Sequence, residues 1–128
     1  MIQQFKNRLQ TSIDLKTALL NNDTILQTLE HIVKDIVASY KNDGKVLWAG
    51  NGGSAADAQH LSAELSGRFY YDRPPLFSEA LHVNTSYTTA VANDYSYDVI
   101  YARLLEGLAK KGDVLVGIST SGNSGNIV

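Results

Sequence analysis

Two short apolar segments, each followed by a loop of small polar residues, constrain the fold of this chain more than any other feature. Residues 45–49 (KVLWA) lead into GNGGS at 50–54, and residues 113–119 (DVLVGIS) lead into the loop STSGNS at 119–124. Apolar runs of this length are typical of strands buried on both faces, and helical patterns lie between them. Such alternation predicts an α/β fold with a doubly wound parallel sheet.

The remaining elements are predicted from hydrophobic periodicity. Apolar residues recur every three or four positions in two N-terminal segments, about residues 5–20 and 26–40, so we expect two amphipathic helices there. Thr24 and Gln27 have capping-box spacing at the start of the second helix, and Gly44 is expected to end it in a left-handed conformation. A weaker strand is predicted at 78–83, and further helices at 54–66, 86–92 and 97–109.

Composition and charge exclude several kinds of ligand. The formal net charge is −2 and the longest basic run is Lys110-Lys111, so the chain offers no basic surface for a nucleic-acid backbone. It has no Cys, so any metal would be bound by His, carboxylate or amide oxygen. The first ten residues are too polar for a signal peptide, and no apolar run approaches the roughly 20 residues of a membrane helix. We expect a soluble, cytoplasmic protein that binds neither nucleic acid nor membrane.

The two polar loops are the predicted ligand site. Ligands of parallel sheets bind beyond the carboxyl ends of the strands. Glycines let backbone N–H groups approach an anion, hydroxyls add donors, and the start of a helix favours phosphate. Neither loop has the spacing of a nucleotide-binding motif. One such loop is as often a plain turn with a helix cap, but two at successive strand ends favour a small phosphorylated ligand.

His60 and Glu64 are the candidate chemical groups. They lie four residues apart on the helix predicted at 54–66, so their side chains project from one face. The pair could be two metal ligands, a ligand and a general base, or an exposed ion pair. Two protein ligands are fewer than the three or four that zinc sites use, so further ligands would have to come from elsewhere.

Three segments carry a resemblance to a known family. GNGGSAADAQHLSAELSGRF at 50–69, AND at 92–94 and GDVLVGISTSGNS at 112–124 resemble the sugar isomerase (SIS) domain family, and within it the phosphoheptose isomerases. The resemblance implies a flavodoxin-like sheet and an isomerase that converts sedoheptulose 7-phosphate to D-glycero-D-manno-heptose 7-phosphate. That product feeds bacterial heptose biosynthesis for lipopolysaccharide or capsule.

The resemblance also implies an organisation of the chain. An N-terminal helical hairpin, residues 1–43, would contribute to the interface of a homotetramer or dimer, and residues 44–128 would form a partial SIS α/β domain. The C-terminal part of the family fold is missing, and the family's other zinc ligands, a Gln and a His, would lie beyond Val128. We therefore expect the sequence to be part of a longer protein or an incomplete gene model.

Position by position, the resemblance assigns the site residues. The resemblance implies His60 and Glu64 as ligands of a zinc cofactor. The chemistry of an aldose–ketose exchange makes Glu64 the candidate catalytic base as well. The two roles of Glu64 compete, because a tightly coordinated carboxylate is a weaker base. For Asp94, a role in orienting sugar hydroxyls competes with a turn that ends a helix. The substrate-binding residues implied by the resemblance are Asn51, Gly52, Gly53, Glu64, Asn93, Asp94, Ser119, Thr120, Ser121 and Ser124.

Two alternatives and two departures from the family pattern accompany this interpretation. A non-catalytic SIS module, such as those that associate with the replication initiator, or a phosphosugar sensor would share the fold; Glu64 and Ser121 favour an enzyme. Trp48 is bulkier than the small residue usual before the glycine loop, and the segment 78–86 (SEALHVNTS) is unusually polar. Both suggest a shifted substrate preference, while His82 is expected to have a packing role.

Overall fold

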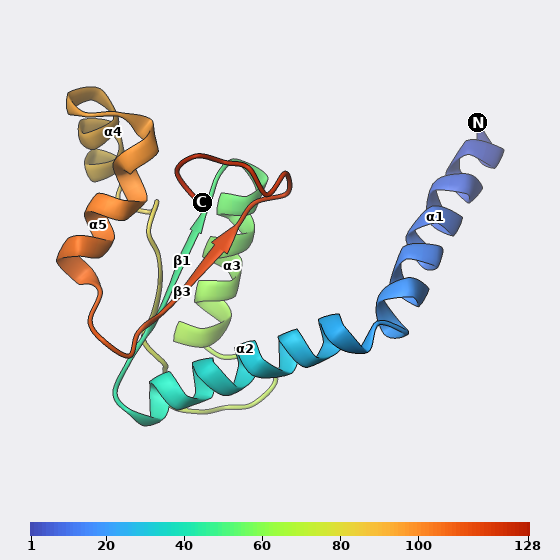
Figure 1. Ribbon diagram of the computed structural model, residues 1–128, viewed down its shortest axis with the longest axis horizontal. Helices are drawn as coiled ribbons and strands as arrows, with labels where there is room; N and C mark the ends of the chain where they lie inside the picture. Colours follow the sequence, from blue (N-terminus) through green and yellow to red (C-terminus); the bar gives the residue numbers. More distant parts are fainter. The chain divides into compact units, whose positions relative to one another are not determined.

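The computed structural model describes all 128 residues, which form two compact units, Met1–Asp35 and Ile36–Val128 (Figure 1). The first unit contains α1 (Ile2–Leu20) and the first part of α2 (Asp23–Lys41). No residue of α1 is buried, although its apolar residues recur at helical spacing. Phe5, Leu9 and Ile13 keep between 55% and 65% of their surface exposed. The division between the two units falls inside α2.

The ends of α2 are built differently from the prediction. The helix begins at Asp23, and the side chain of Asn22 accepts a hydrogen bond from the Ile25 amide at 3.1 Å, so Asn22 rather than Thr24 caps it. After the helix, Asp43 adopts the left-handed conformation with φ of 57°. Gly44 has a different role, because there is no room for a side chain: a Cβ at this position would lie 2.3 Å from the Ser39 Oγ.

The second unit is organised around a three-stranded parallel sheet with strand order β2-β1-β3. β1 (Val46–Gly50) is central, and it pairs with β2 (Ser78–Ala80) and β3 (Val114–Ile118). All five residues of β1 are buried, as expected for a continuous apolar strand with neighbours on both sides. The segment predicted as a weak strand is therefore the edge strand β2.

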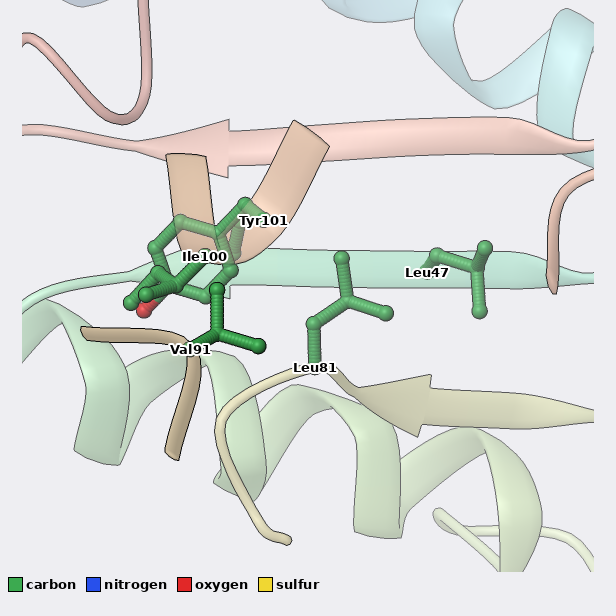
Figure 2. Close-up of a cluster of buried hydrophobic side chains, with 6 residues drawn as sticks. Leu47, Leu81, Val91, Ile100 and Tyr101 are labelled. Carbon is green, nitrogen blue, oxygen red and sulfur yellow. The ribbon is translucent and has the colours of Figure 1, made fainter. Parts of the chain in front are cut away.

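One face of the sheet is covered by α4 (Thr85–Asp94), the short 3-10 helix η1 (Tyr97–Val99) and α5 (Ile100–Leu108). Side chains from these elements meet Leu47 and Ala49 of β1 in one core cluster. Figure 2 shows Tyr101, Ile100 and Val91 gathered near the carboxyl end of β1, and Leu81 and Leu47 lying toward its amino end. Each fully buried aliphatic side chain of this kind contributes roughly 1.5–3 kcal/mol.

The opposite face is covered by α3 (Gly53–Ser66) and the end of α2. Val46 and Trp48 point to this face, because successive residues of a strand alternate between the two sides. They pack with Ala58 of α3, and Ile36 and Tyr40 of α2 complete the cluster. Helices thus cover both faces of a parallel sheet, which confirms the predicted doubly wound α/β fold.

β3 is less protected than β1. In the 128 residues it pairs with β1 alone, and its residues alternate between half-buried and exposed. Leu115 keeps 48% of its surface exposed. The prediction that both apolar runs are buried on both faces is met by β1 and not by β3. None of the helices combines the length and the apolar character needed to cross a bilayer.

Candidate functional site

The loop between β1 and α3 presents free backbone amides at the start of a helix. Gly52 occupies the N-cap position with φ of 57°, and no side chain caps the helix. The amides of Ser54 and Ala55 donate to the carbonyls of Asn51 and Gly52, while those of Gly52 and Gly53 donate to no protein group. The positive end of the helix dipole adds to these two exposed donors, so the loop is suited to an anion.

Gly50 brings α3 against the strand end. A Cβ at this position would lie 2.4 Å from the Ser54 carbonyl oxygen, so no residue with a side chain fits without moving the first turn of the helix. Gly53, by contrast, has open space around the position of a Cβ. The glycines of this motif therefore serve different purposes: Gly50 allows close packing and Gly52 allows a positive φ.

The loop after β3 gathers serine hydroxyls around its own backbone. The Ser119 Oγ lies 3.1 Å from the Ser124 Oγ and 3.4 Å from the Ser121 Oγ. The same Ser119 oxygen accepts the Gly122 amide, and the Ser121 Oγ accepts the Asn123 amide at 3.2 Å. Each Ser–Ser contact uses one hydroxyl hydrogen, so one O–H of the three remains able to donate to a ligand.

The two loops meet at the same edge of the sheet. Gly50 of β1 is in register with Ile118 of β3, so both loops leave the sheet side by side. The side chains of Asn51 and Asn126 form two hydrogen bonds, at 2.7 Å and 3.1 Å, across the two segments. Figure 1 shows the segment after β3 lying over the start of α3. The prediction that the two loops converge at the carboxyl ends of the strands is thus confirmed.

Two tyrosines that the sequence did not single out complete this contact. The Tyr97 hydroxyl donates to the Asn51 Oδ1 at 2.9 Å, and the Tyr101 hydroxyl approaches the same oxygen at 3.4 Å. Burial raises the pKa of Tyr101, and the nearby Tyr97 raises it further, so its hydroxyl stays protonated and donates to the Gly50 carbonyl at 2.5 Å. The only signal in the sequence was the spacing of four between the two tyrosines, which places them on one helical face.

His60 and Glu64 lie on one face of α3, as predicted. The His60 Nε2 is 3.4 Å from the Glu64 Oε1, and the side chains are 74% and 29% exposed. They border a cavity of about 470 Å³. Arg73 closes the end of the helix by donating to the carbonyls of Glu64 and Leu65, each at 2.9 Å. The cavity is lined by Ile36, Trp48, His60, Leu61, Glu64, Leu65, Phe69 and Arg73.

As a metal site the pair is incomplete. An imidazole nitrogen and a carboxylate oxygen are donors that zinc accepts, but zinc sites use three or four protein ligands. No group of three or more His, Cys, Asp or Glu side chains in the 128 residues is arranged to hold a metal ion. The type of donor therefore fits zinc, and the number of donors in this chain does not.

Glu64 and the two loops occupy different regions of the chain. Glu64 follows Gly53 by 11 positions in the same helix. At a rise of 1.5 Å per residue, this places their backbones about 17 Å apart along the helix axis. The carboxylate is therefore held near the opposite end of α3 from the free amides of Gly52 and Gly53.

Asn93 and Asp94 are the last two residues of α4, and both are exposed. The Asn93 amide donates to the Asp94 Oδ1 at 2.9 Å, and this is the one hydrogen bond that their side chains make. The dipeptide does end a helix, as the structural alternative for Asp94 expects. Neither side chain is hydrogen-bonded to the loops, so the structure leaves both free to meet a ligand.

Trp48 and His82 have structural surroundings. Trp48 is 7% exposed, and its indole N–H donates to the buried Ser78 Oγ at 2.8 Å, so its bulk belongs to the core. His82 follows β2, and its Nδ1 is buried with no hydrogen-bond partner. Burial lowers the pKa of His82, which keeps the imidazole neutral at pH 7.

Comparisons with known proteins agree with this geometry. A family model described as SIS domain matches residues 12–128. The chain is 47% identical over 128 residues to the phosphoheptose isomerase of Sulfurimonas denitrificans, covering 100% of this chain and 66% of that protein. It is 52% identical over 117 residues to the phosphoheptose isomerase of Mycobacterium tuberculosis, covering 91% of this chain and 60% of that protein.

Solved structures give the same result. A phosphoheptose isomerase from Francisella tularensis superposes with a TM-score of 0.87 at 35% identity, over 98% of this chain and 65% of that one. The phosphoheptose isomerase from Neisseria gonorrhoeae gives a TM-score of 0.81 at 37% identity, again over 98% and 65%. The chain therefore spans between 60% and 66% of the length of the relatives named here.

Proposed function

The chain belongs to the SIS domain family, and from this membership we propose that it functions as a phosphoheptose isomerase. The proposed reaction interconverts sedoheptulose 7-phosphate and D-glycero-D-manno-heptose 7-phosphate, in the cytoplasm, for bacterial heptose biosynthesis. The observation that carries the proposal is the convergence of two donor-rich loops at one sheet edge, joined by the Asn51–Asn126 contact. The sequence identity to phosphoheptose isomerases supports the choice of sugar.

The two loops would hold the phosphate group. The free amides of Gly52 and Gly53 and the helix start offer donors from one side. Hydroxyls of the second loop, Ser119, Thr120, Ser121 and Ser124, offer donors from the other. Hydrogen bonds to a charged group contribute about 1.5–3 kcal/mol each, so a few of them suffice for micromolar binding. The exposed side chains of Asn93 and Asp94 would contact sugar hydroxyls.

Glu64 would act as the base. An exchange between ketose and aldose removes a proton from the carbon beside the carbonyl, which gives an enediol, and returns a proton to the neighbouring carbon. A second proton passes from one oxygen to the other. A positioned carboxylate can carry the first proton in both steps, and such proton transfer accelerates a reaction by about 10²–10⁴-fold. The half-buried Glu64 at the edge of the 470 Å³ cavity suits this role.

The separation between Glu64 and the loops favours an assembly of several chains. About 17 Å along α3 is too far for one carboxylate to reach a sugar held at the loops of the same chain. We propose a homotetramer in which Glu64 of one protomer lies beside the loops of a neighbouring protomer. The apolar side chains of α1, such as Phe5, Leu9 and Ile13, are exposed in the single chain and would be buried by subunit contacts.

His60 and Glu64 would supply two ligands of a zinc ion, with further ligands from outside these 128 residues. When bound, zinc would polarise the sugar carbonyl and stabilise the negative charge on its oxygen. The His60 imidazole is 74% exposed, so it would be accessible for binding the zinc ion.

Turnover of sedoheptulose 7-phosphate, with and without zinc, tests the proposal. Glu64→Gln should keep binding of the sugar phosphate and lose about 10²–10⁴-fold in kcat. Glu106→Gln, on the exposed side of α5, removes the same charge and should leave turnover unchanged. Binding of the sugar phosphate without turnover by the unmodified protein would instead indicate a sensor or a regulatory SIS module.

A further inference from the structure

Three side chains surround that of Asn51. We name the cluster of four residues, Asn51, Tyr97, Tyr101 and Asn126, the Asn51 clasp. The Asn51 Oδ1 accepts from the Tyr97 hydroxyl at 2.9 Å and from the Asn126 Nδ2 at 3.1 Å. The Tyr101 hydroxyl lies 3.4 Å from the same oxygen and donates to the neighbouring Gly50 carbonyl at 2.5 Å. In return the Asn51 Nδ2 donates to the Asn126 Oδ1 at 2.7 Å. The four residues come from three segments of the chain: the loop after β1, the continuous stretch of η1 and α5, and the segment after β3.

The clasp uses the full acceptor capacity of Asn51. A carboxamide oxygen has two lone pairs, and donors from Tyr97 and Asn126 already occupy both directions. The carboxamide of Asn51 therefore has no acceptor left for a sugar hydroxyl. Its side chain can offer a ligand one remaining N–H, which suits an anion and not a hydroxyl donor.

The clasp also fixes the segment after β3. Asn126 keeps only 9% of its surface exposed, so its carboxamide is held inside the protein. Next to it, Ile127 lies so close to β3 that a Cβ on Gly117 would be 2.9 Å from the Ile127 Cγ2. The serine loop is thus anchored by β3 at its start and by the Asn51–Asn126 contact at its end.

We propose that Tyr97 and Asn126 are positioning residues that hold the two loops in the arrangement required to bind a phosphate group. This rests on the proposed function for the identity of the sugar and on the loop geometry for the phosphate. Affinity is gained when donors are already in place before the ligand arrives. Loss of the clasp should therefore weaken binding of phosphate esters, while the proton transfer by Glu64, at the far end of α3, is preserved.

The test compares two variants with matched controls in binding of inorganic phosphate and in turnover of sedoheptulose 7-phosphate. Tyr97→Phe removes one oxygen atom from a side chain that is half exposed, and Tyr95→Phe removes the corresponding oxygen from a neighbour whose hydroxyl has no partner. Asn126→Ala removes both hydrogen bonds to Asn51, and Asn42→Ala removes an asparagine whose side chain bonds only to the Ala38 carbonyl.

We expect the Kd for phosphate and the KM for the sugar phosphate to rise about three- to tenfold in Tyr97→Phe and tenfold or more in Asn126→Ala. The kcat should change by less than about threefold, and the two control variants should behave as the unmodified protein. The double variant Asn51→Ala with Asn126→Ala should have the same Kd and KM as either single variant, because the two residues act as one unit.

Unchanged Kd and KM in both variants would overturn the proposal, as would a lower melting temperature without a change in KM. If Asn126→Ala does not fold, Tyr97→Phe decides the outcome alone. If the unmodified protein binds phosphate but does not turn over the heptose phosphate, the proposed function is refuted. The role of the clasp is then still tested by the Kd for phosphate in the variants. Failure to bind phosphate at all would overturn both.

Discussion

The ammonium group of Lys45 lies 2.5 Å from the Oδ2 of Asp113, and both side chains are almost fully buried, at 11% and 7% exposed. The two residues immediately precede β1 and β3. Asp113 also accepts from the backbone amides of Lys45, at 3.0 Å, and Lys110, at 2.6 Å. This one carboxylate therefore ties together the amino ends of the two strands whose other ends carry the site.

Removal of the Asp113 charge should strongly destabilise the fold. Asp113→Asn leaves the buried ammonium of Lys45 without a counter-charge, which costs about 3–5 kcal/mol of unfolding free energy. The matched control is Glu30→Gln, because Glu30 and Lys34 form an ion pair at 2.6 Å that is about 60% exposed and is worth less than about 1 kcal/mol. Urea denaturation measures the free energy of unfolding of both variants. An equal loss in the two would contradict the assignment of Lys45 and Asp113 as a buried ion pair.

The same carboxylate should make stability depend on acid pH. Burial raises the pKa of Asp113, but hydrogen bonds from Lys45 and Lys110 lower it more, so it lies below the ordinary value. The unfolded chain therefore takes up this proton first as the pH falls. The stabilisation is present above about pH 4 and is lost as the pH falls through the lowered pKa of the folded state. Urea midpoints between pH 7 and 3 should fall more steeply for the unmodified protein than for Asp113→Asn; parallel curves would refute this.

Two glycines of one motif should respond in opposite ways to the same substitution. Gly50→Ala forces a Cβ to 2.4 Å from the Ser54 carbonyl, so the first turn of α3 must move, at a cost of about 1–3 kcal/mol. Gly53→Ala meets nothing within 4 Å and should be neutral or stabilising by up to about 1 kcal/mol, because it restricts the unfolded chain. Thermal unfolding of the two variants distinguishes these effects, and a stable Gly50→Ala would contradict the close approach.

The buried hydrogen bond between Trp48 and Ser78 should show energetic coupling. Trp48→Phe removes the donor and Ser78→Ala removes the acceptor, and each leaves a buried polar group unpaired or a small cavity, at about 1–3 kcal/mol. The double variant should cost less than the sum of the two, since the interaction can be lost only once. Ser86→Ala, on an exposed serine, is the control. If the losses of unfolding free energy in the two single variants add up to the loss in the double variant, the hydrogen bond does not contribute to stability.

Local patterns in the sequence were sufficient for the architecture. Apolar runs at 45–49 and 113–119 located β1 and β3, because a strand buried on both faces needs a continuous run of such residues. The convergence of the two loops followed as well, since parallel strands direct their carboxyl ends to one edge of the sheet. Periodicity placed the helices within a few residues of their observed ends.

Contacts that depend on three-dimensional packing were not accessible in this way. Asn51 and Asn126 are 75 residues apart, and their hydrogen bonds depend on the register between β1 and β3. Asn22 and Asp43 took roles predicted for Thr24 and Gly44, because several nearby residues could satisfy the same backbone requirement.

The uninterrupted helix from Gly53 to Ser66 sets the distance between the proposed phosphate-binding loop and the Glu64 carboxylate. Inserting a single residue between His60 and Glu64 would push Glu64 about 1.5 Å further and swing it around the axis by about 100°, away from His60 and its cavity. The number of residues between the glycine motif and Glu64 should therefore tolerate substitution far better than insertion or deletion.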